Sequence, residues 1–336
     1  MRAAPGGTVA SVPGTRGTGV VSTGVASLAV RDVLRGPRRP GKVLAVLPHA
    51  ICVGFGEAVP EPRVVAISPP DALRLPNAII AGPFQAQPPS IQDEVPSFQD
   101  QPPSWQEQVP SFQDRVPSWQ DRVPSFQDQA AAECWAGDGR VLACGLEIRV
   151  IRWWDPTPVF GPLSRARLDH GCGILAKLCS AAAHEPGLDE ADGPGRLAAC
   201  CAAGDLAGAV EAVEQLVGLG PGLVPSGDSM VSGVLLALRL LGGAISGGTR
   251  AVWLANWLSA AATCDATART SALAASLLHC AAGGQAGAEV SAVLLGMAGQ
   301  EPLEPAAGRL LASRQGADLA WGLVAGGRAA LRLSVS

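Results

Sequence analysis

Residues 218–238 read GLGPGLVPSGDSMVSGVLLAL, a glycine-rich loop that runs into an apolar helix. Three of its first five residues are glycines, which allow positive φ angles and the close approach of a ligand. Ser226 opens the predicted helix, so several unpaired backbone N–H groups and the positive end of the helix dipole face the loop. Such a junction is a natural anion or phosphate site. It matches neither the P-loop pattern nor the glycine pattern of dinucleotide-binding proteins.

The same residues also have a purely structural interpretation. Ser226 is then the N-cap and Asp228 a first-turn carboxylate that complements the helix dipole in a rigid helix–helix connector. A cap of this kind contributes about 1 kcal/mol. The carboxylate counts against a bare phosphate site, so Asp228 could instead hold a substrate amide, an ammonium group or a metal ion. These physical arguments leave both interpretations open.

Helical patterns continue on both sides of the loop. Asp205 is a plausible N-cap for a helix that ends at Val217, because apolar residues recur on one face of that stretch. Glycines occur at the ends of the predicted helices, as expected at C-caps. The other predicted helices cover residues 163–183, 196–203, 227–241, 249–262, 270–282, 286–298, 303–314 and 317–331.

The chain before these helices has the pattern of short strands rich in Val and Ile. The predicted strands are residues 43–47, 50–55, 63–67, 77–81, 140–144 and 147–152. The predicted fold class is therefore α+β, with a β-rich N-terminal domain followed by an all-α helical C-terminal domain. We predict a disordered tail at residues 1–24, the β-rich domain at 25–160 and the helical domain, which contains the glycine-rich loop, at 161–336.

Residues 88–129 consist of six copies of a seven-residue unit such as VPSFQDR. A period of seven suggests a coiled coil, but proline in every copy removes a backbone donor and clashes with the preceding turn. We expect an extended or disordered insert within the β-rich domain. The heptapeptide repeat is either a duplication tolerated in a surface loop or a multivalent aromatic–proline ligand for a partner.

The composition excludes several classes of protein. Among 336 residues, 48% are hydrophobic and the formal net charge is -4, so the chain can build a core and has no basic excess for nucleic acid. The nine cysteines lack a CxxC pair, which argues against disulfides and a zinc site. Neither a secretion signal nor a membrane span is visible. We expect a cytoplasmic protein without a metal, a cofactor or a membrane partner.

The loop and its helix resemble the signature of the family of the AllH subunit of oxamate carbamoyltransferase. That signature reads approximately GLGPGLTPSGDD and is followed by an apolar helix with a glycine, here Gly233. Two weaker stretches fit the same family: residues 269–274, RTSALA, and residues 315–318, QGAD. The strands from about residue 24 to residue 82 also suit it. The resemblance covers most of the chain except the N-terminal tail and the repeat.

The resemblance implies a subunit of a carbamoyl-transferring complex in purine-ureide (allantoin) catabolism. It implies two partners, an acyl-CoA-synthetase-like subunit and a third subunit, and a small anionic or amide substrate. A carbamoyl group would pass between an amide such as oxamate and phosphate, a reaction that needs donors for the phosphate and for a polarised carbonyl. We predict catalytic roles for Asp228 and Asp318. The predicted substrate-binding residues are Gly220, Gly222, Ser226, Gly227, Ser229, Arg269, Thr270, Ser271 and Gly316.

Four polar positions of the family's motifs are changed in this chain. Val224 stands in place of Thr, Ser229 in place of Asp, and both Ala274 and Gln315 in place of Ser. This pattern fits a retained fold with altered or lost chemistry, and equally a different substrate. Two hypotheses follow. The chain is an enzyme subunit that binds carbamoyl phosphate or a related anion at residues 218–229, or it is a non-catalytic scaffold subunit that binds partner proteins.

Overall fold

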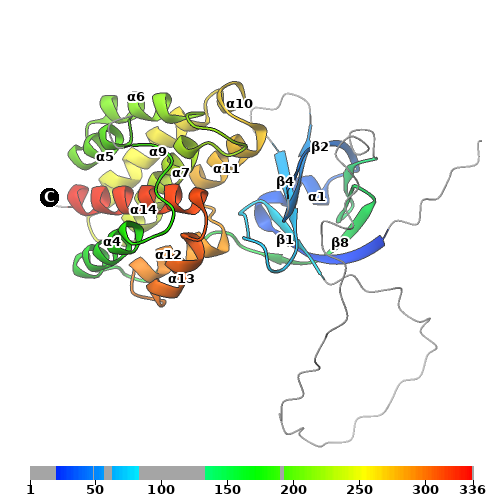
Figure 1. The fold of residues 1–336 in the computed structure, drawn as a ribbon, viewed down its shortest axis with the longest axis horizontal. Helices are drawn as coiled ribbons and strands as arrows, with labels where there is room; N and C mark the ends of the chain where they lie inside the picture. The colour runs from blue at the N-terminus through cyan, green and yellow to red at the C-terminus, as the bar shows by residue number, and fades with distance from the viewer. Residues whose placement is uncertain (1–19, 48, 57–62, 83–132, 190–192, 335–336) are drawn as a thin grey trace, which may run out of the picture.

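A computed structural model describes the protein over residues 20–47, 49–56, 63–82, 133–189 and 193–334. Its strands all lie in the N-terminal part of the chain and its long helices in the C-terminal part, and the two parts lie side by side (Figure 1). The predicted α+β class is therefore confirmed. The heptapeptide repeat lies outside the described residues.

Eight strands close into a barrel in the order β1-β5-β4-β3-β2-β6-β7-β8. The pairs β1/β8 and β4/β5 are parallel, and the others are antiparallel. Alternate residues of a strand point to opposite faces, so Ile51, Val53 and Phe55 of β3 fill the interior. The strands are β1 (Val20–Ser27), β2 (Arg39–Leu47), β3 (Ala50–Phe55), β4 (Arg63–Ser68), β5 (Ala78–Ala81), β6 (Trp135–Gly137), β7 (Arg140–Ala143) and β8 (Leu146–Trp154).

Two of these strands were not predicted. Because β1 begins at Val20, the predicted tail is wrong for residues 20–24, whose serine, threonine and glycine dilute the apolar pattern of the strand. β6 has only three residues, too few for a periodic signal. The short helices η1 (Leu28–Val30) and α1 (Arg31–Arg35) follow β1 and bury Val30, Val33 and Leu34 in the barrel core.

The helical region follows the predicted pattern with shifted boundaries. Asp205 is the N-cap of α6 as predicted, since its carboxylate accepts a hydrogen bond from the N–H of Gly208 at 3.1 Å. The helix predicted at residues 270–282 begins at Ala272, and the short helix that precedes it, at Ala266–Arg269, was not predicted. The helices are α4 (Arg165–Ser180), α5 (Pro194–Ala203), α6 (Leu206–Leu216), α7 (Ser226–Leu236), α8 (Gly242–Ala244), α9 (Thr249–Thr263), α10 (Ala266–Arg269), α11 (Ala272–Ala282), α12 (Ala288–Met297), α13 (Leu303–Leu310) and α14 (Arg314–Leu333), with a π-helical turn, η3 (Ala237–Leu241), between α7 and α8.

Helices α7 and α14 form the centre of this region, and the other long helices surround them (Figure 1). All residues of α7 are buried. The two helices approach closely at Gly233 and Gly322, where a Cβ on either glycine would overlap the backbone of the opposite helix. Small residues at this crossing therefore fix the position of α7 and of the loop before it.

Ser226–Ala244, which spans α7, η3 and α8, is long and apolar enough to cross a membrane by length and composition alone. Within the described residues it is the one helix with this property, and 78% of its most apolar window is buried in the protein. The packing around α7 accounts for these apolar side chains as part of the core.

The two regions meet along a seam formed by the outer faces of β3 and β4 and by α11. Cys52 and Val64 pack there against Leu273 of α11. The segment between β4 and β5 also reaches the helices, because the N–H of Arg74 donates to Glu289 at 3.2 Å and its carbonyl accepts from Ala288 at 3.1 Å. The barrel thus supplies one wall of the space described next.

Candidate functional site

The glycine-rich loop adopts the backbone conformation that its sequence predicts. Gly218, Gly220 and Gly222 have φ angles of 82°, 113° and 100°, a region that favours glycine. The loop folds back on the start of α7. The N–H of Gly218 donates to Oδ1 of Asp228 at 2.9 Å, and the N–H of Gly227 donates to the carbonyl of Leu219 at 2.9 Å. Two of the N–H groups expected to face an anion are therefore engaged within the chain.

Asp228 joins three segments of the helical region. Its Oδ2 accepts a hydrogen bond from Oγ1 of Thr270 at 2.5 Å, while its Oδ1 binds Gly218. The side chain is 2% exposed. Burial raises the pKa of this carboxyl, and the hydrogen bonds from Thr270 and Gly218 oppose that rise. The carboxylate thus ties the loop and α7 to the segment that precedes α11.

The second matched stretch, residues 269–274, also contacts the glycine-rich loop. Ser271 is the N-cap of α11: its hydroxyl accepts from the N–H of Ala274 and donates to the carbonyl of Leu223 in the loop. The guanidinium of Arg269 donates to the carbonyl of Glu214 near the end of α6. The two motifs therefore meet in the structure, and the side chains of Arg269 and Ser271 bind backbone carbonyls there.

Asp318 has a different set of partners. Its Oδ1 accepts from the N–H of Gly187 at 2.7 Å, and the hydroxyl of Ser226 also binds the carboxylate. Burial raises the pKa of this carboxyl, and these two hydrogen bonds oppose the rise. Ser226 is the first residue of α7 and Pro225 is the N-cap, so the predicted capping role of Ser226 is wrong. Its hydroxyl instead links α7 to α14.

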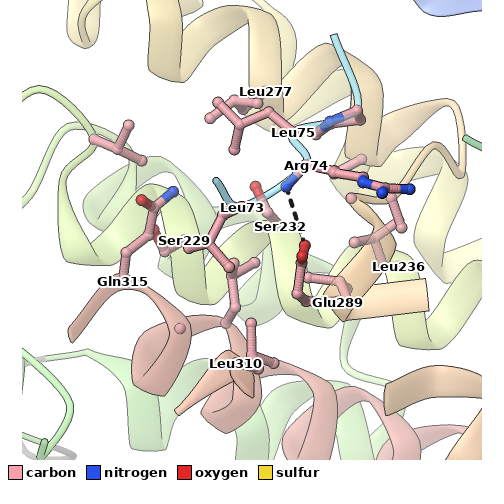
Figure 2. A pocket seen from close by; sticks show the side chains of 18 of the residues that line it. Leu73, Arg74, Leu75, Ser229, Ser232, Leu236, Leu277, Glu289, Leu310 and Gln315 are labelled. Carbon is pink, nitrogen blue, oxygen red and sulfur yellow. Dashed lines mark hydrogen bonds between the residues drawn. The ribbon is translucent and has the colours of Figure 1, made fainter. Parts of the chain in front are cut away.

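A pocket lies where the barrel segment Leu73–Pro76 faces α7, α11, α12 and α14 (Figure 2). We call it the first pocket. It contains about 700 Å³ of space, part of which is open to solvent. The lining residues are Leu73, Arg74, Leu75, Pro76, Val224, Asp228, Ser229, Ser232, Leu236, Ala274, Leu277, Ala281, Gln285, Ala286, Gly287, Glu289, Val290, Leu310, Ser313, Gln315, Gly316 and Leu319.

Three of the predicted site residues line this pocket: Asp228, Ser229 and Gly316. The structure does not bring the second predicted catalytic residue, Asp318, to the pocket wall. The other predicted residues that lie outside its lining are Gly220, Gly222, Ser226, Gly227, Arg269, Thr270 and Ser271. Their catalytic and binding roles remain predictions.

The polar groups of the first pocket are few and mostly uncharged or acidic. Ser229 is 2% exposed, and its hydroxyl has no hydrogen-bond partner among the residues that the structure describes. A buried hydroxyl without a partner is unusual and requires an explanation such as a ligand. Carboxylates come from Asp228 and Glu289, whereas the one basic lining side chain is the exposed Arg74.

Sequence reasoning missed several residues of this wall. Ser232 lies one helical turn after Asp228 and Ser229, so helical periodicity could have placed it on the same face. Glu289 is a first-turn acid of α12, a position that by itself signals only dipole complementation. Nothing local in Leu73–Pro76 indicates that this segment of the barrel reaches the helices.

All four positions at which the chain departs from the resembled motifs line the first pocket. Val224, Ser229, Ala274 and Gln315 come from the loop, α7, α11 and α14, and are far apart in sequence. The changes therefore concern one space in the protein. Figure 2 shows Ser229 and Gln315 in its wall.

A comparison with known families points to the same part of the chain, the segment that lines the first pocket. The profile of the family described as oxamate carbamoyltransferase subunit AllH matches residues 216–327. The resemblance seen in the sequence is confirmed over that segment, which runs from the end of α6 into α14. It contains all the residues that line the first pocket except Leu73–Pro76. No curated protein matches the chain, and no solved structure matches it.

The described residues contain no group of three or more His, Cys, Asp or Glu side chains that could hold a metal ion.

Proposed function

We propose that this chain is a subunit of a carbamoyltransferase complex and that the first pocket holds its amide substrate. The observation that carries the proposal is the coincidence of two findings. The segment that matches the AllH family supplies the helical wall of the pocket, and that wall contains a buried hydroxyl without a partner among the described residues.

The lining suits a small amide that also bears a carboxylate, as oxamate does. The hydroxyl of Ser229 can donate to the carbonyl of the amide substrate, whose oxygen takes up negative charge as the amide nitrogen loses a proton and bonds to the carbamoyl carbon. The carboxylates of Asp228 and Glu289 accept from the amide N–H groups. The carboxylate end of the substrate would face the guanidinium of Arg74, since no other lining side chain is basic.

Carbamoyl phosphate or a related anion is the expected second ligand, at residues 218–229. The N–H groups of Gly218 and Gly227 are engaged within the chain and are not available to this ligand. An anion would bind at the outer side of the loop near Gly222, which is exposed and has open space beside its Cα. The proposed partners are an acyl-CoA-synthetase-like subunit and a third subunit, in the cytoplasm.

The test is an assay of carbamoyl transfer from carbamoyl phosphate to the amide nitrogen of oxamate, followed by the phosphate that the reconstituted complex releases. Omission of this chain should abolish activity. Ser229→Ala should lower activity about tenfold, the loss expected for one hydrogen bond. Ser259→Ala is the matched control because Ser259 is a buried serine of α9 outside the pocket. Equal activity of Ser229→Ala and the unaltered protein would contradict the proposed site.

A second candidate is a non-catalytic assembly subunit, and one observation favours it. The four departures from the resembled motifs all line the first pocket, and two of them, Val224 and Ala274, leave apolar side chains there. In that case the complex requires this chain for assembly, whereas substitutions in the pocket leave its activity unchanged. Gel filtration of the mixed subunits, with and without this chain, separates assembly from catalysis.

A further inference from the structure

We propose that a second pocket, at the seam between the barrel and α11, binds a small zwitterion of the α-amino acid class. It contains about 750 Å³ of space, part of which is open to solvent. Its lining residues are Ala29, Val30, Asp32, Val33, Arg63, Val64, Asn77, Ser276, His279, Cys280 and Gln285. The barrel and the helical region both contribute polar side chains to it.

The second pocket differs from the first in its charges. Asp32 of α1 and Arg63 of β4 place one negative and one positive side chain in the same wall. These two side chains form no ion pair with each other, and neither has an ion-pair partner elsewhere among the described residues. Two opposite charges that do not neutralise each other can bind the two charged ends of one ligand.

Asn77 provides the second observation. It is 1% exposed, and its Nδ2 donates to the carbonyl of Val64 at 3.0 Å and to Oγ of Ser276 at 3.4 Å. These two bonds fix the orientation of the amide. Its Oδ1 is then left buried without a partner among the described residues. A buried acceptor in a pocket wall is satisfied when a ligand supplies an N–H donor.

Together these groups define the chemistry of the ligand. The guanidinium of Arg63 suits a carboxylate, which it can bind through two parallel N–H donors. Asp32 and Oδ1 of Asn77 both accept hydrogen bonds and suit an ammonium group. A ligand with both functions close together is an α-amino acid or a compound of similar size.

The two pockets share one lining residue, Gln285, and the chain passes from one to the other between Pro76 and Asn77. Gln285 therefore faces both pockets. The proposal does not depend on the reaction proposed for the first pocket.

Calorimetric titration of the full-length chain tests the proposal, with glycine, acetate and methylammonium as probes. Glycine carries both functions and should bind at least about tenfold more tightly than either of the other probes, since each of these lacks one charge-assisted contact. Absence of glycine binding at millimolar concentration, or equal affinity for the three probes, would overturn the proposal.

Variants locate the binding site. Arg63→Gln should weaken glycine binding about tenfold and leave methylammonium binding unchanged. Arg31→Gln removes the same charge from α1 at an exposed position outside the lining, and it should bind glycine as the unaltered protein does. An equal loss in both variants would show a general effect of charge and would overturn the assignment. Ser229→Ala, in the first pocket, should leave glycine binding unchanged.

Discussion

The barrel and the helical region bury different kinds of side chain. The barrel core is built from large apolar residues such as Ile51, Ile67 and Ile148. The helical region buries two carboxylates, Asp228 and Asp318, whereas the buried polar residues of the barrel, such as Ser27 and Ser68, are uncharged. Burial of a charge is costly unless hydrogen bonds compensate for it, and both carboxylates accept such bonds from backbone N–H groups. The buried carboxylates therefore lie in the region that also supplies most of the lining of the first pocket.

The two regions also contain glycines in different surroundings. At the α7–α14 crossing, a Cβ on Gly233 or Gly322 would overlap the backbone of the opposite helix, whereas a Cβ on Gly54 of β3 would meet the side chain of Leu44. Substitutions at these positions should therefore have unequal effects.

Gly233→Ala is expected to have the largest effect, a loss of about 3 kcal/mol in the free energy of unfolding, because the new Cβ would overlap the backbone of α14. Gly54→Ala in β3 is the matched barrel variant. Its Cβ would meet Cδ1 of Leu44 at 3.2 Å, a side chain that can rotate, so the loss should stay below about 1 kcal/mol. Calorimetric unfolding of both variants measures the two losses. Equal losses would refute the contrast between the regions.

Asp228→Ala should cost about 2–4 kcal/mol of unfolding free energy, because it leaves the N–H of Gly218 and the hydroxyl of Thr270 without their acceptor. Asp228→Asn retains one acceptor and should cost about 1 kcal/mol. In the barrel, Asp138→Asn changes only an exposed ion pair with Arg38 and should cost well under about 1 kcal/mol. Urea unfolding gives all three values.

If Asp228 also acts on substrate, Asp228→Asn should lower binding or turnover by about one to two orders of magnitude. A structural role alone would leave both unchanged. This comparison separates the two interpretations that the sequence leaves open, because the same variant is tested for unfolding and for binding.

The buried carboxylate Asp318 should make the stability of the helical region depend on pH. Burial raises the pKa of Asp318, so its charged form is the costly one in the folded protein. That cost is present at neutral pH and is relieved as the pH falls through the raised pKa. Asp318→Asn has no such titration. The unaltered protein should therefore gain stability relative to Asp318→Asn on mild acidification, as measured by the difference between their melting temperatures. A relative gain by the variant would contradict the sign.

The smallest difference between the two regions is expected in the reactivity of their buried thiols. Burial raises the pKa of Cys52 in the barrel to about 11 and that of Cys280 in α11 to about 12, so both are poor nucleophiles. Cys264 is exposed. A thiol reagent should modify Cys264 on the order of a hundredfold faster than these two, and Cys264→Ser should remove that phase. Rapid modification of Cys52 in the folded protein would show that the seam between the barrel and α11 opens readily.

The fold could be predicted where local pattern and burial agree. β3 spans the residues predicted for it, since Ala50–Phe55 is bounded and rich in apolar residues. β1 could not be predicted in the same way, because its stability depends on pairing with β8, from which it is separated by more than a hundred residues. The helices were found by periodicity and by caps such as Asp205.

The candidate site could be predicted only in part. The motifs singled out Asp228 and Thr270 as site residues, and the structure joins the two side chains directly. The partner of Asp318, Gly187, follows from long-range packing that no local signal encodes. The same reason explains why the contribution of Leu73–Pro76 to the first pocket was missed.

The central claim is that the first pocket binds the amide substrate through the unpartnered hydroxyl of Ser229. Calorimetric titration of oxamate into the unaltered chain, Ser229→Ala and Ser259→Ala tests it most directly. We predict binding to the unaltered chain and to Ser259→Ala with equal affinity, and about tenfold weaker binding to Ser229→Ala. Equal affinity in all three proteins, or no binding to any of them, would contradict the claim.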